Sequence, residues 1–578
     1  MHSDSQLRFG IMCSGTSFSD YAAEAIEKLL DMERVSLELL IVDDRHTTDG
    51  EKATDNPGAV TNFKSKLLTL RELKERKGVR GMINTVQWHF YTSYRGTAAA
   101  DVSRDMAAQF EDVDRLYCTP RQDGFSVYFD EGDLEHIREF NLDFIFRRGF
   151  GIVRGDIHNV AKYGIWSYHH DDERKYRGSP PCFWEIYNSD PITGAILQRL
   201  TDRLDGGIIL KRGHFPTISD HLENINQVKY STADWPAQVA NDILNGNGDY
   251  VNSEPSSTDA KIYKKPSPPQ LLRFLIKTKT PTVGTLFQGH PDWNIGVIKS
   301  PIQNVIEKEI ENEIEWFPRT DTSSSFIADP FGCEINGEKY IFFEEYMHEK
   351  GKGRISFVRY DDGFESSPEV ALEEPFHISY PYLFTHEGDV YAVPETNDIR
   401  EIRLYRVREP SDWVHEATIL SDVPASDPTV IKHKDYWWMF YTSHGEGLSH
   451  LTDLRIQYSS DLTGEWKAHG QNPVKNDCRS ARPGGTPFNC ESELYRPAQY
   501  CAGEYGEKVV LNRVTELSPG TFSEKRVREI QADSDGPYPV GRHTLSAFDD
   551  MTLIDGKRRV YNIETLKKRL SQVYKKLK

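Results

Sequence analysis

The chain has 578 residues, with 70 Lys or Arg and 89 Asp or Glu, so its formal net charge at pH 7 is −19. An acidic protein lacks the basic surface that releases counterions from phosphates, which argues against general nucleic-acid binding. The length suffices for two or three domains, each with a full core. An aromatic content of 11% together with 41 glycines is typical of a globular, turn-rich enzyme rather than a disordered chain.

Cysteines and apolar runs indicate the compartment. The seven cysteines are scattered and show no CxxC spacing, so we expect reduced thiols and no bound metal. The N-terminus lacks a basic region followed by a long apolar run, so we expect no signal peptide. No stretch approaches the ~20 apolar residues of a membrane span. We therefore expect a soluble, cytoplasmic protein.

The first part of the sequence alternates between strand and helix patterns. A helical pattern, YAAEAIEKLL, follows the first of four apolar strand candidates, LRFGIMCSG (7–15), LELLIVDD (37–44), LDFIFRRGFGIV (142–153) and YGIWSYHH (163–170). Such alternation predicts a mostly parallel sheet with helices on both faces, and ligands at the carboxyl ends of the strands. We predict a Rossmann-like α/β domain over residues 1–244.

The composition changes near residue 245. The stretch NGNGDYVNSEPSSTDAKIYKKPSPP is rich in Gly, Ser, Asn and Pro, and we interpret residues 245–285 as a linker. Short aromatic strands follow, and a weak repeat of roughly 45–70 residues predicts an all-β, five-bladed β-propeller over residues 286–556. The repeated blade openings lie at Asp329, Tyr380, Asp427, Arg496 and Arg542.

The C-terminal segment 557–578 predicts a basic amphipathic helix, because apolar residues recur at helical spacing among lysines and arginines. Such a segment on an acidic protein suggests peripheral contact with an anionic membrane surface. A helix docked on its own domain explains the same pattern.

A polar cluster, SYHHDDERKYRG (167–178), follows the fourth predicted strand. A histidine at a strand end can exchange a proton with a reacting carbonyl oxygen if a carboxylate orients it. Asp205 can supply that carboxylate, because Gly206 and Gly207 after it permit close backbone approach. A metal site at His170 and its neighbouring acids, or a solvated polar loop, are the alternatives to a His169–Asp205 pair.

The run GIWSYHHDDERKYRGSPPCFWEIYNSDPITGAILQRLTDRLDGGIIL resembles the core of the 10-formyltetrahydrofolate-dependent formyltransferases. RRGFGIVRGDIHNV resembles the folate-facing loop of that family, and LRFGIMCSG its first strand. The resemblance covers about residues 7–217. It implies a formyltransferase-like fold, 10-formyltetrahydrofolate as cofactor, and transfer of a formyl group to an amine.

The resemblance also implies roles for individual residues. His169 corresponds to the histidine that stabilises the oxyanion, Asp205 to the carboxylate that tunes it, and Ser167 takes the place of the family's asparagine. The loop after His169 is polar here, whereas the family has His-Pro-Ser-Leu-Leu-Pro. The remaining matches are the corner at Tyr176, Arg177 and Gly178, the pterin-lining Ile152 and Val153, and the turn at Gly206 and Gly207.

The second part resembles two families. Its blade openings are similar to those of five-bladed glycoside hydrolase family 43, and residues 293–544 resemble the N-terminal domain of plant glucosamine inositolphosphorylceramide transferases. Residues that open each inner strand converge on the centre of a propeller. We expect the centre to be lined by Asp329, Tyr380, Asp427, Arg496 and His543, with Glu395 and His377 nearby. Tyr380 replaces an acid of the hydrolase pattern.

Two functions from different classes follow. In the first, the N-terminal domain transfers a formyl group to an amino sugar or nucleotide sugar, and the propeller holds the glycan. In the alternative, the propeller is a glycosyltransferase- or glycosidase-like enzyme and the formyltransferase-like domain is vestigial or regulatory. A third reading is a glycan-binding assembly factor without catalysis.

Overall fold

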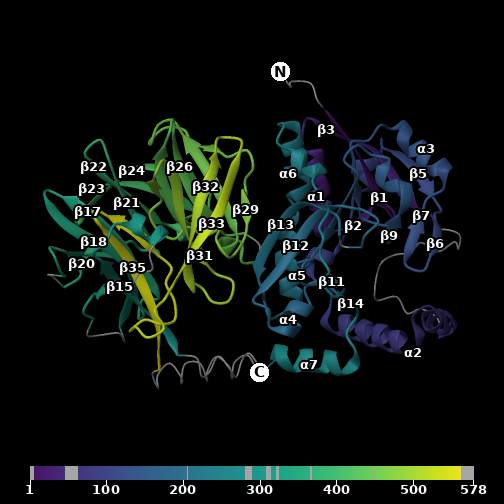
Figure 1. Ribbon diagram of the computed structural model, residues 1–578, viewed down its shortest axis with the longest axis horizontal. Helices are drawn as coiled ribbons and strands as arrows, with labels where there is room; N and C mark the ends of the chain where they lie inside the picture. Colours follow the sequence, from purple (N-terminus) through teal and green to yellow (C-terminus); the bar gives the residue numbers. More distant parts are fainter. Residues whose placement is uncertain are drawn as a thin grey trace. The chain divides into compact units, whose positions relative to one another are not determined.

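The structure is a computed structural model, and it describes residues 6–45, 63–204, 206–279, 289–307, 314–319, 324–364, 367–445 and 447–561. The chain divides into two compact units, one formed by Met1–Gly213 with Thr217–Lys279 and the other by His214–Pro216 with Thr280–Lys578. Figure 1 shows strands and helices mixed in the first unit, and strands in the second. Among the described residues, no helix is long and apolar enough to cross a membrane.

A seven-stranded sheet forms the centre of the first unit. β1 pairs in parallel with β3 and β8, β8 pairs in parallel with β10, and β12 runs antiparallel to β10. The prediction of a mostly parallel α/β sheet is therefore confirmed. The strand order is β13 (Ile208–Pro216), β12 (Ile192–Arg199), β10 (Ile165–His169), β8 (Phe144–Arg147), β1 (Leu7–Cys13), β3 (Val35–Asp43) and β5 (Asp114–Cys118).

Helices supply apolar faces to this sheet. In α1, Ala22, Ile26 and Leu29 are buried at the three- and four-residue spacing of one helix face. In α3, Leu134 and Ile137 join the same core as the inward residues of β1 and β3. The helices are α1 (Asp20–Leu30), α2 (Phe63–Arg95), α3 (Glu131–Glu139), α4 (Trp184–Asn188), α5 (His221–Thr232), α6 (Trp235–Leu244) and α7 (Pro268–Lys279).

The segment that we predicted as a linker, 245–285, is structured over much of its length. Its strand β14 (Ile262–Tyr263) pairs in parallel with β11 (Arg177–Gly178). Leu271 and Phe274 of α7 are buried in an aromatic core. The residues up to 279 belong to the first unit. The high Pro, Ser and Gly content of the segment favoured a linker, so the apolar face of α7 was not predicted.

The second unit contains five antiparallel sheets within the described residues, so the five-bladed propeller is confirmed. The first blade comprises β17 (Ser325–Ile335), β18 (Glu338–Met347), β19 (Lys352–Arg359) and β20 (Glu369–Leu372); the second comprises β21 (Ser379–His386), β22 (Asp389–Glu395), β23 (Glu401–Glu409) and β24 (Asp412–Ser421). The third comprises β25 (Ala425–His433), β26 (Tyr436–Ser443), β27 (Asp453–Ser459), β28 (Lys467–Ala468) and β29 (Lys475–Asn476); the fourth comprises β30 (Phe488–Cys490), β31 (Glu493–Tyr500), β32 (Lys508–Leu517) and β33 (Phe522–Gln531).

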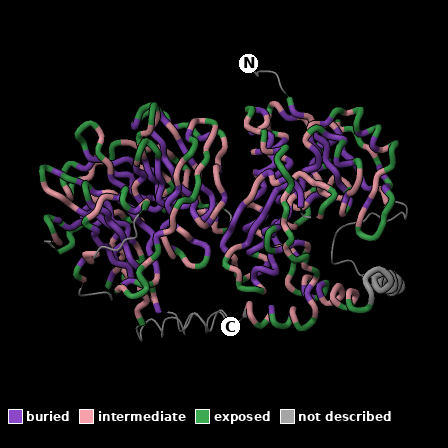
Figure 2. The backbone as a smooth tube through the Cα atoms, viewed as in Figure 1, coloured by how far each residue is buried: buried purple, intermediate pink, exposed green. Residues whose placement is uncertain are grey.

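The fifth blade closes the ring by pairing strands from distant parts of the sequence. β15 (His290–Ile298) lies between β16 (Glu315–Trp316) and β35 (Met551–Val560), and β35 also pairs with β34 (Leu545–Phe548). Residues 557–560 are therefore strand, not the start of the predicted C-terminal helix. Residues 562–578 lie outside the described residues. Figure 2 shows the buried backbone concentrated along the strands of this unit.

Candidate functional site

Three blades of the propeller carry a strained residue at the same place in their first strand. Asp329, Tyr380 and Asp427 each precede a proline, have φ angles of 54°, 44° and 50°, and lie where the strand register shifts. A positive φ costs a residue other than glycine about 1–3 kcal/mol and persists only where surrounding contacts impose it. Because β17 contacts β21 and β21 contacts β25, these bulges gather on neighbouring inner strands.

Asp427 is fixed by a dense set of hydrogen bonds. Arg482 donates from Nε to Oδ2 at 2.6 Å and from Nη2 to Oδ1 at 3.2 Å, and Gln499 Nε2 donates to Oδ2 at 2.6 Å. The main-chain amide of Asp427 donates to Glu395 Oε2 at 3.0 Å. Asp427 is 2% exposed, so this carboxylate is buried with its charge paired.

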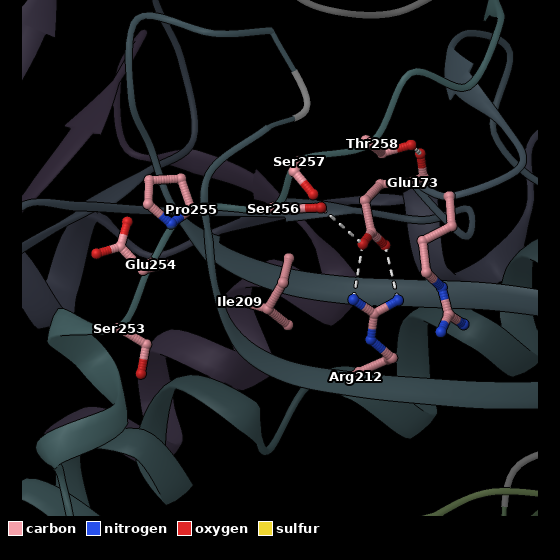
Figure 3. A pocket seen from close by; sticks show the side chains of 10 residues that line it. Glu173, Ile209, Arg212, Ser253, Glu254, Pro255, Ser256, Ser257 and Thr258 are labelled. Atoms are coloured by element: carbon pink, nitrogen blue, oxygen red, sulfur yellow. Dashed lines mark hydrogen bonds and ion pairs between the residues drawn. The ribbon is translucent and has the colours of Figure 1, made fainter.

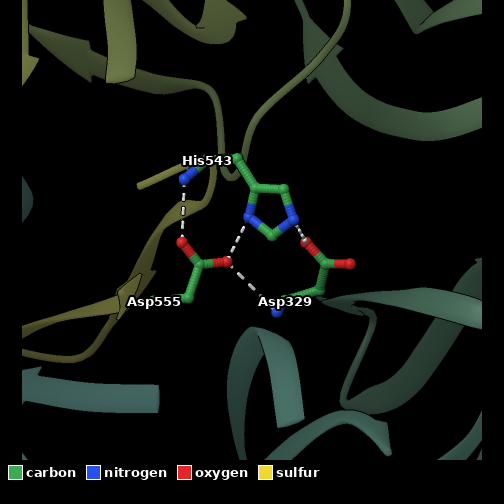
Figure 4. Close-up of side chains that lie close together, drawn as sticks. All are labelled: Asp329, His543 and Asp555. Atoms are coloured by element: carbon green, nitrogen blue, oxygen red, sulfur yellow. Dashed lines mark hydrogen bonds and ion pairs between the residues drawn. The ribbon is translucent and has the colours of Figure 1, made fainter. Parts of the chain in front are cut away.

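Asp329 belongs to a second buried group, which Figure 4 shows with His543 between two carboxylates. His543 Nδ1 contacts Asp555, and His543 Nε2 lies 3.7 Å from Asp329 Oδ1. Thr544 Oγ1 donates to Asp329 Oδ1 at 2.5 Å. The ligand atoms of Asp329, His543 and Asp555 lie within 4.8 Å of one another, so the group could hold a cation.

The buried acids raise one another's proton affinity. Burial, followed by the charges of Asp427 and Asp555 and opposed by His543, raises the pKa of Asp329 to about 6. Burial and the charges of Asp329, Glu395 and Asp427 raise the pKa of Glu344 well above its usual value. Burial and Asp427 do the same for Glu395. Four carboxyl groups from three neighbouring blades therefore form one electrostatic cluster. We call this group the central acid cluster (Asp329, Glu344, Glu395 and Asp427).

Partly exposed rings border the central acid cluster. Tyr505 is 39% exposed, and its ring lies 5.2 Å from the Arg482 guanidinium carbon and 5.4 Å from the His543 ring. His377 Nε2 lies 3.9 Å from Glu344 Oε1. Glu344 itself is 8% exposed. Tyr505 therefore links the buried cluster to the protein surface through Arg482 and His543.

The structure brings together most of the predicted propeller residues, but it places Arg496 away from them. Arg496 does not face the cluster; it pairs with Glu524 at 2.8 Å and donates to the carbonyls of Ser480 and Ala481. The fourth blade opens at Arg482 instead, whose following proline bridges to β31.

Tyr380 has a structural role, and three residues were missed. The Tyr380 hydroxyl accepts from Gly485 N at 2.8 Å and lies 3.0 Å from Thr429 Oγ1. The missed residues are Arg482, Glu344 and Asp555. The Arg-Pro pair in ARPGG is a blade-opening signal that could have identified Arg482, whereas Glu344 lies mid-strand without one.

In the first unit, His169 is the last residue of β10, as the motif implied. It is 9% exposed, and its Nε2 lies 3.0 Å from the carbonyl oxygen of Tyr176. Asp205 lies outside the described residues, so the His169–Asp205 pair stays a prediction. The Ser167 hydroxyl accepts from Arg147 Nη1 at 3.0 Å, so an arginine reaches the position next to the predicted oxyanion site.

The residues assigned to the folate lie in different environments. Val153 is 3% exposed and packs in the core of the first unit, so it does not line an open pterin pocket, whereas Ile152 is half-buried. A Cβ on Gly207 would lie 2.3 Å from the Arg199 carbonyl oxygen, so this turn requires glycine. Gly206 donates to the Arg203 carbonyl oxygen at 3.3 Å.

The Tyr-Arg-Gly corner holds the chain together at β11. Arg177 donates to the carbonyls of Leu204 and Ala260. Gly178 has a φ of +94°, and a Cβ there would lie 2.2 Å from the Tyr263 carbonyl oxygen. Burial raises the pKa of Tyr176. These structural contacts are sufficient to explain the three residues of the corner.

The acids of the polar loop are held by arginines and by one main-chain amide. Asp172 accepts two bonds from Arg174, at 2.8 and 2.7 Å. Glu173 is fully buried and accepts from both Nη atoms of Arg212, at 3.0 and 2.7 Å. Asp171 accepts from the amide of Cys182 at 2.8 Å.

Figure 3 shows Glu173 and Arg212 at the wall of a pocket of about 530 Å³. The other lining residues come largely from one hydroxyl-rich segment: Arg174, Ile209, Ser253, Glu254, Pro255, Ser256, Ser257 and Thr258.

The second unit is similar to a family of plant transferases. Residues 316–538 match the family described as glucosamine inositolphosphorylceramide transferase 1, N-terminal. The protein of that name from Oryza sativa subsp. indica is 35% identical over 267 residues, which cover 42% of this chain and 36% of the relative. The Arabidopsis thaliana protein is 34% identical over 257 residues, covering 42% of this chain and 34% of the relative. The chain thus spans about a third of the length of these relatives.

The N-terminal region is similar to methionyl-tRNA formyltransferase. The enzyme from Agathobacter rectalis is 26% identical over 138 residues, which cover 23% of this chain and 44% of the relative. Among solved structures, a family 117 glycoside hydrolase of Zobellia galactanivorans matches 41% of this chain and 87% of its own, with 13% identity and a TM-score of 0.31.

Proposed function

We propose that the propeller binds a sugar at the central acid cluster and that the chain is a carbohydrate-active enzyme, with the formyltransferase-like unit in a regulatory or vestigial role. The observation that carries this proposal is the burial of four neighbouring carboxyl groups, Asp329, Glu344, Glu395 and Asp427, of which the first three have a raised pKa. Glycosidic bonds are formed and broken by paired carboxyl groups, one protonated and one charged. A cluster in which Asp427 is paired with Arg482 and the pKa values of Glu344 and Glu395 are raised well above the usual value can supply both forms.

The surroundings favour an amino sugar. An ammonium group on the ligand would favour the charged forms of Glu344 and Glu395, which burial and the neighbouring acids disfavour. The ring of Tyr505 offers an apolar face against which a sugar ring can stack. The name of the plant relatives includes glucosamine, which supports the same class of ligand.

The cellular setting belongs to the proposal as well. We place the chain in the cytoplasm, next to an anionic membrane surface that its basic C-terminal segment would contact. The relatives' name includes a ceramide lipid, which supports a membrane-associated acceptor. Co-sedimentation with anionic liposomes should fall when the chain is shortened to end at residue 561, and equal sedimentation would remove the membrane contact.

Binding experiments test the sugar site. Glucosamine-containing glycosides should bind the native protein by calorimetry, and Asp329→Asn and Glu344→Gln should each weaken binding at least tenfold. Glu493→Gln is the matched control, because Glu493 is 47% exposed and pairs with Arg513 on the blade surface. Unchanged affinity in both cluster variants would contradict the sugar site. Release of a free or transferred sugar, lost in the same variants, would establish catalysis.

Formyl transfer to an amino sugar is the second candidate, and one contact favours it. Arg147 donates to Ser167, two residues before His169, so a guanidinium stands near the position of the family's asparagine. Guanidinium N–H groups can stabilise the oxyanion that forms when an amine attacks a carbonyl. The described residues therefore fit the formyl end of 10-formyltetrahydrofolate, although Val153 is unavailable to the pterin.

In this reaction the cofactor would supply the formyl carbon. Arg147 would donate to the developing oxyanion, and Ser167 would orient the guanidinium. Because His169 Nε2 faces the Tyr176 carbonyl oxygen, it would carry the N–H of the ring, and the other ring nitrogen would accept a proton from the attacking amine. Each of these roles uses a group at the carboxyl ends of β8 and β10.

The test separates cofactor binding from turnover. Titration with a non-reactive folate should show binding that Arg147→Ala weakens, and formyl transfer to amino-sugar nucleotides should be lost in His169→Asn. Arg154→Ala removes one positive charge at another position of the same unit and serves as the control for the loss of charge. If no folate binds and no formyl group is transferred, the first unit is not a formyltransferase and the first proposal stands alone.

A further inference from the structure

The helix α2 has two apolar faces from residue 79 onward. On one face Trp88 and Tyr91 are buried in an aromatic core of the first unit. The other face is exposed, and Phe90 and Tyr94 on it are 71% and 84% exposed. Its apolar residues recur at spacings of four, seven and four, which place them on one side of a helix: Val79, Ile83, Phe90 and Tyr94.

The helix α7 packs beside α2 and exposes apolar side chains as well. The ring of Phe274 in α7 meets the ring of Tyr91 in α2 edge-on, with 6.1 Å between their centres. Leu272 and Ile276 lie one helical turn apart and are both more than half exposed. Figure 1 shows the two helices along the same margin of the first unit. We call their exposed apolar residues the α2–α7 surface (Val79, Ile83, Phe90, Tyr94, Leu272 and Ile276).

The regularity and length of this surface indicate an interaction site. Single exposed apolar residues are normal on soluble proteins, whereas contiguous exposed patches commonly mark binding surfaces. From Val79 to Tyr94 the row extends about 22 Å along the helix axis. The neighbouring Leu272 and Ile276 add apolar area on the second helix.

The charge of the same segments points to the kind of partner. Residues 79–95 and 261–278 contain no Asp or Glu, although the whole chain has 89 acidic residues against 70 basic ones. One of their basic residues, Arg95, forms an ion pair with Asp220 at 2.5 Å. The basic residues of the two segments are Arg80, Arg95, Lys261, Lys264, Lys265, Arg273 and Lys277. An acidic protein therefore carries one apolar surface with a local excess of positive charge.

A second copy of the chain fits this surface poorly. Two copies that met through α2 and α7 would bring their basic side chains together, and neither helix segment supplies acids to pair with them. An anionic membrane instead offers negative head groups to Lys and Arg and an apolar layer to Phe, Leu and Ile. The amphipathic ring of a tyrosine such as Tyr94 is suited to the boundary between the two layers.

We propose that the α2–α7 surface binds an anionic membrane, with Phe90, Tyr94, Leu272 and Ile276 inserted between the lipid head groups. The basic residues of the two segments would contact the lipid phosphates. Repulsion of the other, acidic parts of the chain from the same lipids would orient the first unit with this surface toward the membrane. The contact is separate from the sugar site and from the C-terminal segment.

Sedimentation of the full chain with lipid vesicles tests the apolar part of the surface. Vesicles of phosphatidylcholine with phosphatidylserine should bind the native chain, and Phe90→Ser combined with Tyr94→Ser should lower the partition coefficient at least tenfold. The matched control is Tyr117→Ser combined with Phe125→Ser. These two rings are 56% and 65% exposed elsewhere in the first unit, and their loss should change the partition coefficient less than about twofold.

Charge reversal tests the basic part. Lys264→Glu combined with Arg273→Glu should lower partitioning into the anionic vesicles at least tenfold and remove their advantage over phosphatidylcholine alone. Lys467→Glu combined with Lys525→Glu makes the same charge change at exposed positions of β28 and β33. That control should lower partitioning less than about threefold.

The C-terminal segment is intact in all of these variants, so its own contribution to sedimentation is the same in each. If shortening the chain to residue 561 abolishes sedimentation but the α2–α7 variants sediment as the native chain does, the C-terminal segment is the membrane contact and this proposal is overturned. It is also overturned if the native chain does not bind the anionic vesicles. Analytical ultracentrifugation supplies the last outcome: a native dimer that Phe90→Ser with Tyr94→Ser converts to a monomer would show that a second copy covers the surface. Sugar binding measured by calorimetry should be unchanged in every variant, so the two proposals can fail separately.

Discussion

Arg482 and Asp427 form a forked ion pair at the propeller centre, with N–O distances of 2.6 and 3.2 Å. Their side chains are 10% and 3% exposed. Arg482 is also 3.6 Å from Glu395 Oε2, and its charge opposes the rise in the pKa of Glu395. One guanidinium thus pairs with Asp427 and partly offsets the raised pKa of the neighbouring Glu395.

Removing Arg482 should destabilise the propeller strongly. Arg482→Met leaves the Asp427 carboxylate buried with Gln499 as its remaining side-chain donor, and breaking a buried pair in this way costs about 3–5 kcal/mol. Arg513→Met, at an exposed pair with Glu493, should cost less than about 1 kcal/mol. Urea denaturation followed by tryptophan fluorescence measures both. Equal losses would show that the Asp427 pair contributes no more than a surface contact.

Ionisation of Asp329 should make the propeller less stable as pH rises. Its pKa is about 6 when folded and 3.8 ordinarily, so the folded state binds this proton more tightly than the unfolded chain. The stabilisation is complete below about pH 4 and is lost as pH rises through about 6. Asp329→Asn cannot ionise, so its unfolding free energy relative to the native chain should increase by up to about 3 kcal/mol between pH 4 and 7.

Unfolding titrations at several pH values check this prediction. Asp412→Asn, at an exposed position of β24, should show no such trend. A difference between Asp329→Asn and the native chain that does not change with pH would mean that the folded-state pKa of Asp329 is ordinary.

Local sequence patterns predicted the propeller, but they could not select all of its central residues. The residue-proline pairs at Asp329, Tyr380 and Asp427 mark inner-strand bulges, and the structure places all three there. Arg482 and Arg496 carry the same signature in the fourth blade. Which of the two arginines reaches the centre depends on how their segments pair in the folded blade. Such long-range pairing cannot be predicted from a short motif.

The same limit applies elsewhere in the chain. Glu344 reaches the cluster from the middle of β18, where strand alternation predicts burial but not a shared charge environment. In the first unit, the motif placed His169 at the end of β10, while the guanidinium of Arg147 arrives from the neighbouring strand. Apolar side chains within residues 262–279 are buried in an aromatic core. The Pro- and Lys-rich composition of this segment did not predict that packing.

A methyl group at Gly178 should detach β14 from β11. Gly178→Ala would place Cβ 2.2 Å from the Tyr263 carbonyl oxygen, in addition to the strain of a φ of +94°. Gly124→Ala has a φ of +61° but nothing within 4 Å, so it isolates the strain alone. We expect Gly178→Ala to accelerate proteolysis within residues 253–279 at least tenfold, and Gly124→Ala to leave it unchanged. Equal cleavage would mean that β14 contributes little to holding this segment.

Arg212 should be essential to the polar loop after His169, whereas Arg174 should not. Glu173 is fully buried and accepts hydrogen bonds from both Nη atoms of Arg212. Arg212→Ala therefore leaves a buried carboxylate whose remaining side-chain donor, among the residues that the structure describes, is the Ser256 hydroxyl at 3.3 Å. We expect the free energy of local unfolding to fall by about 3–5 kcal/mol. Amide exchange in residues 170–178 should therefore become at least a hundredfold faster. The Arg174 side chain is 49% exposed, and Arg174→Ala should change exchange less than about fivefold. Hydrogen-exchange mass spectrometry of both variants measures this difference, and similar exchange in the two would show that the loop does not depend on the buried pair.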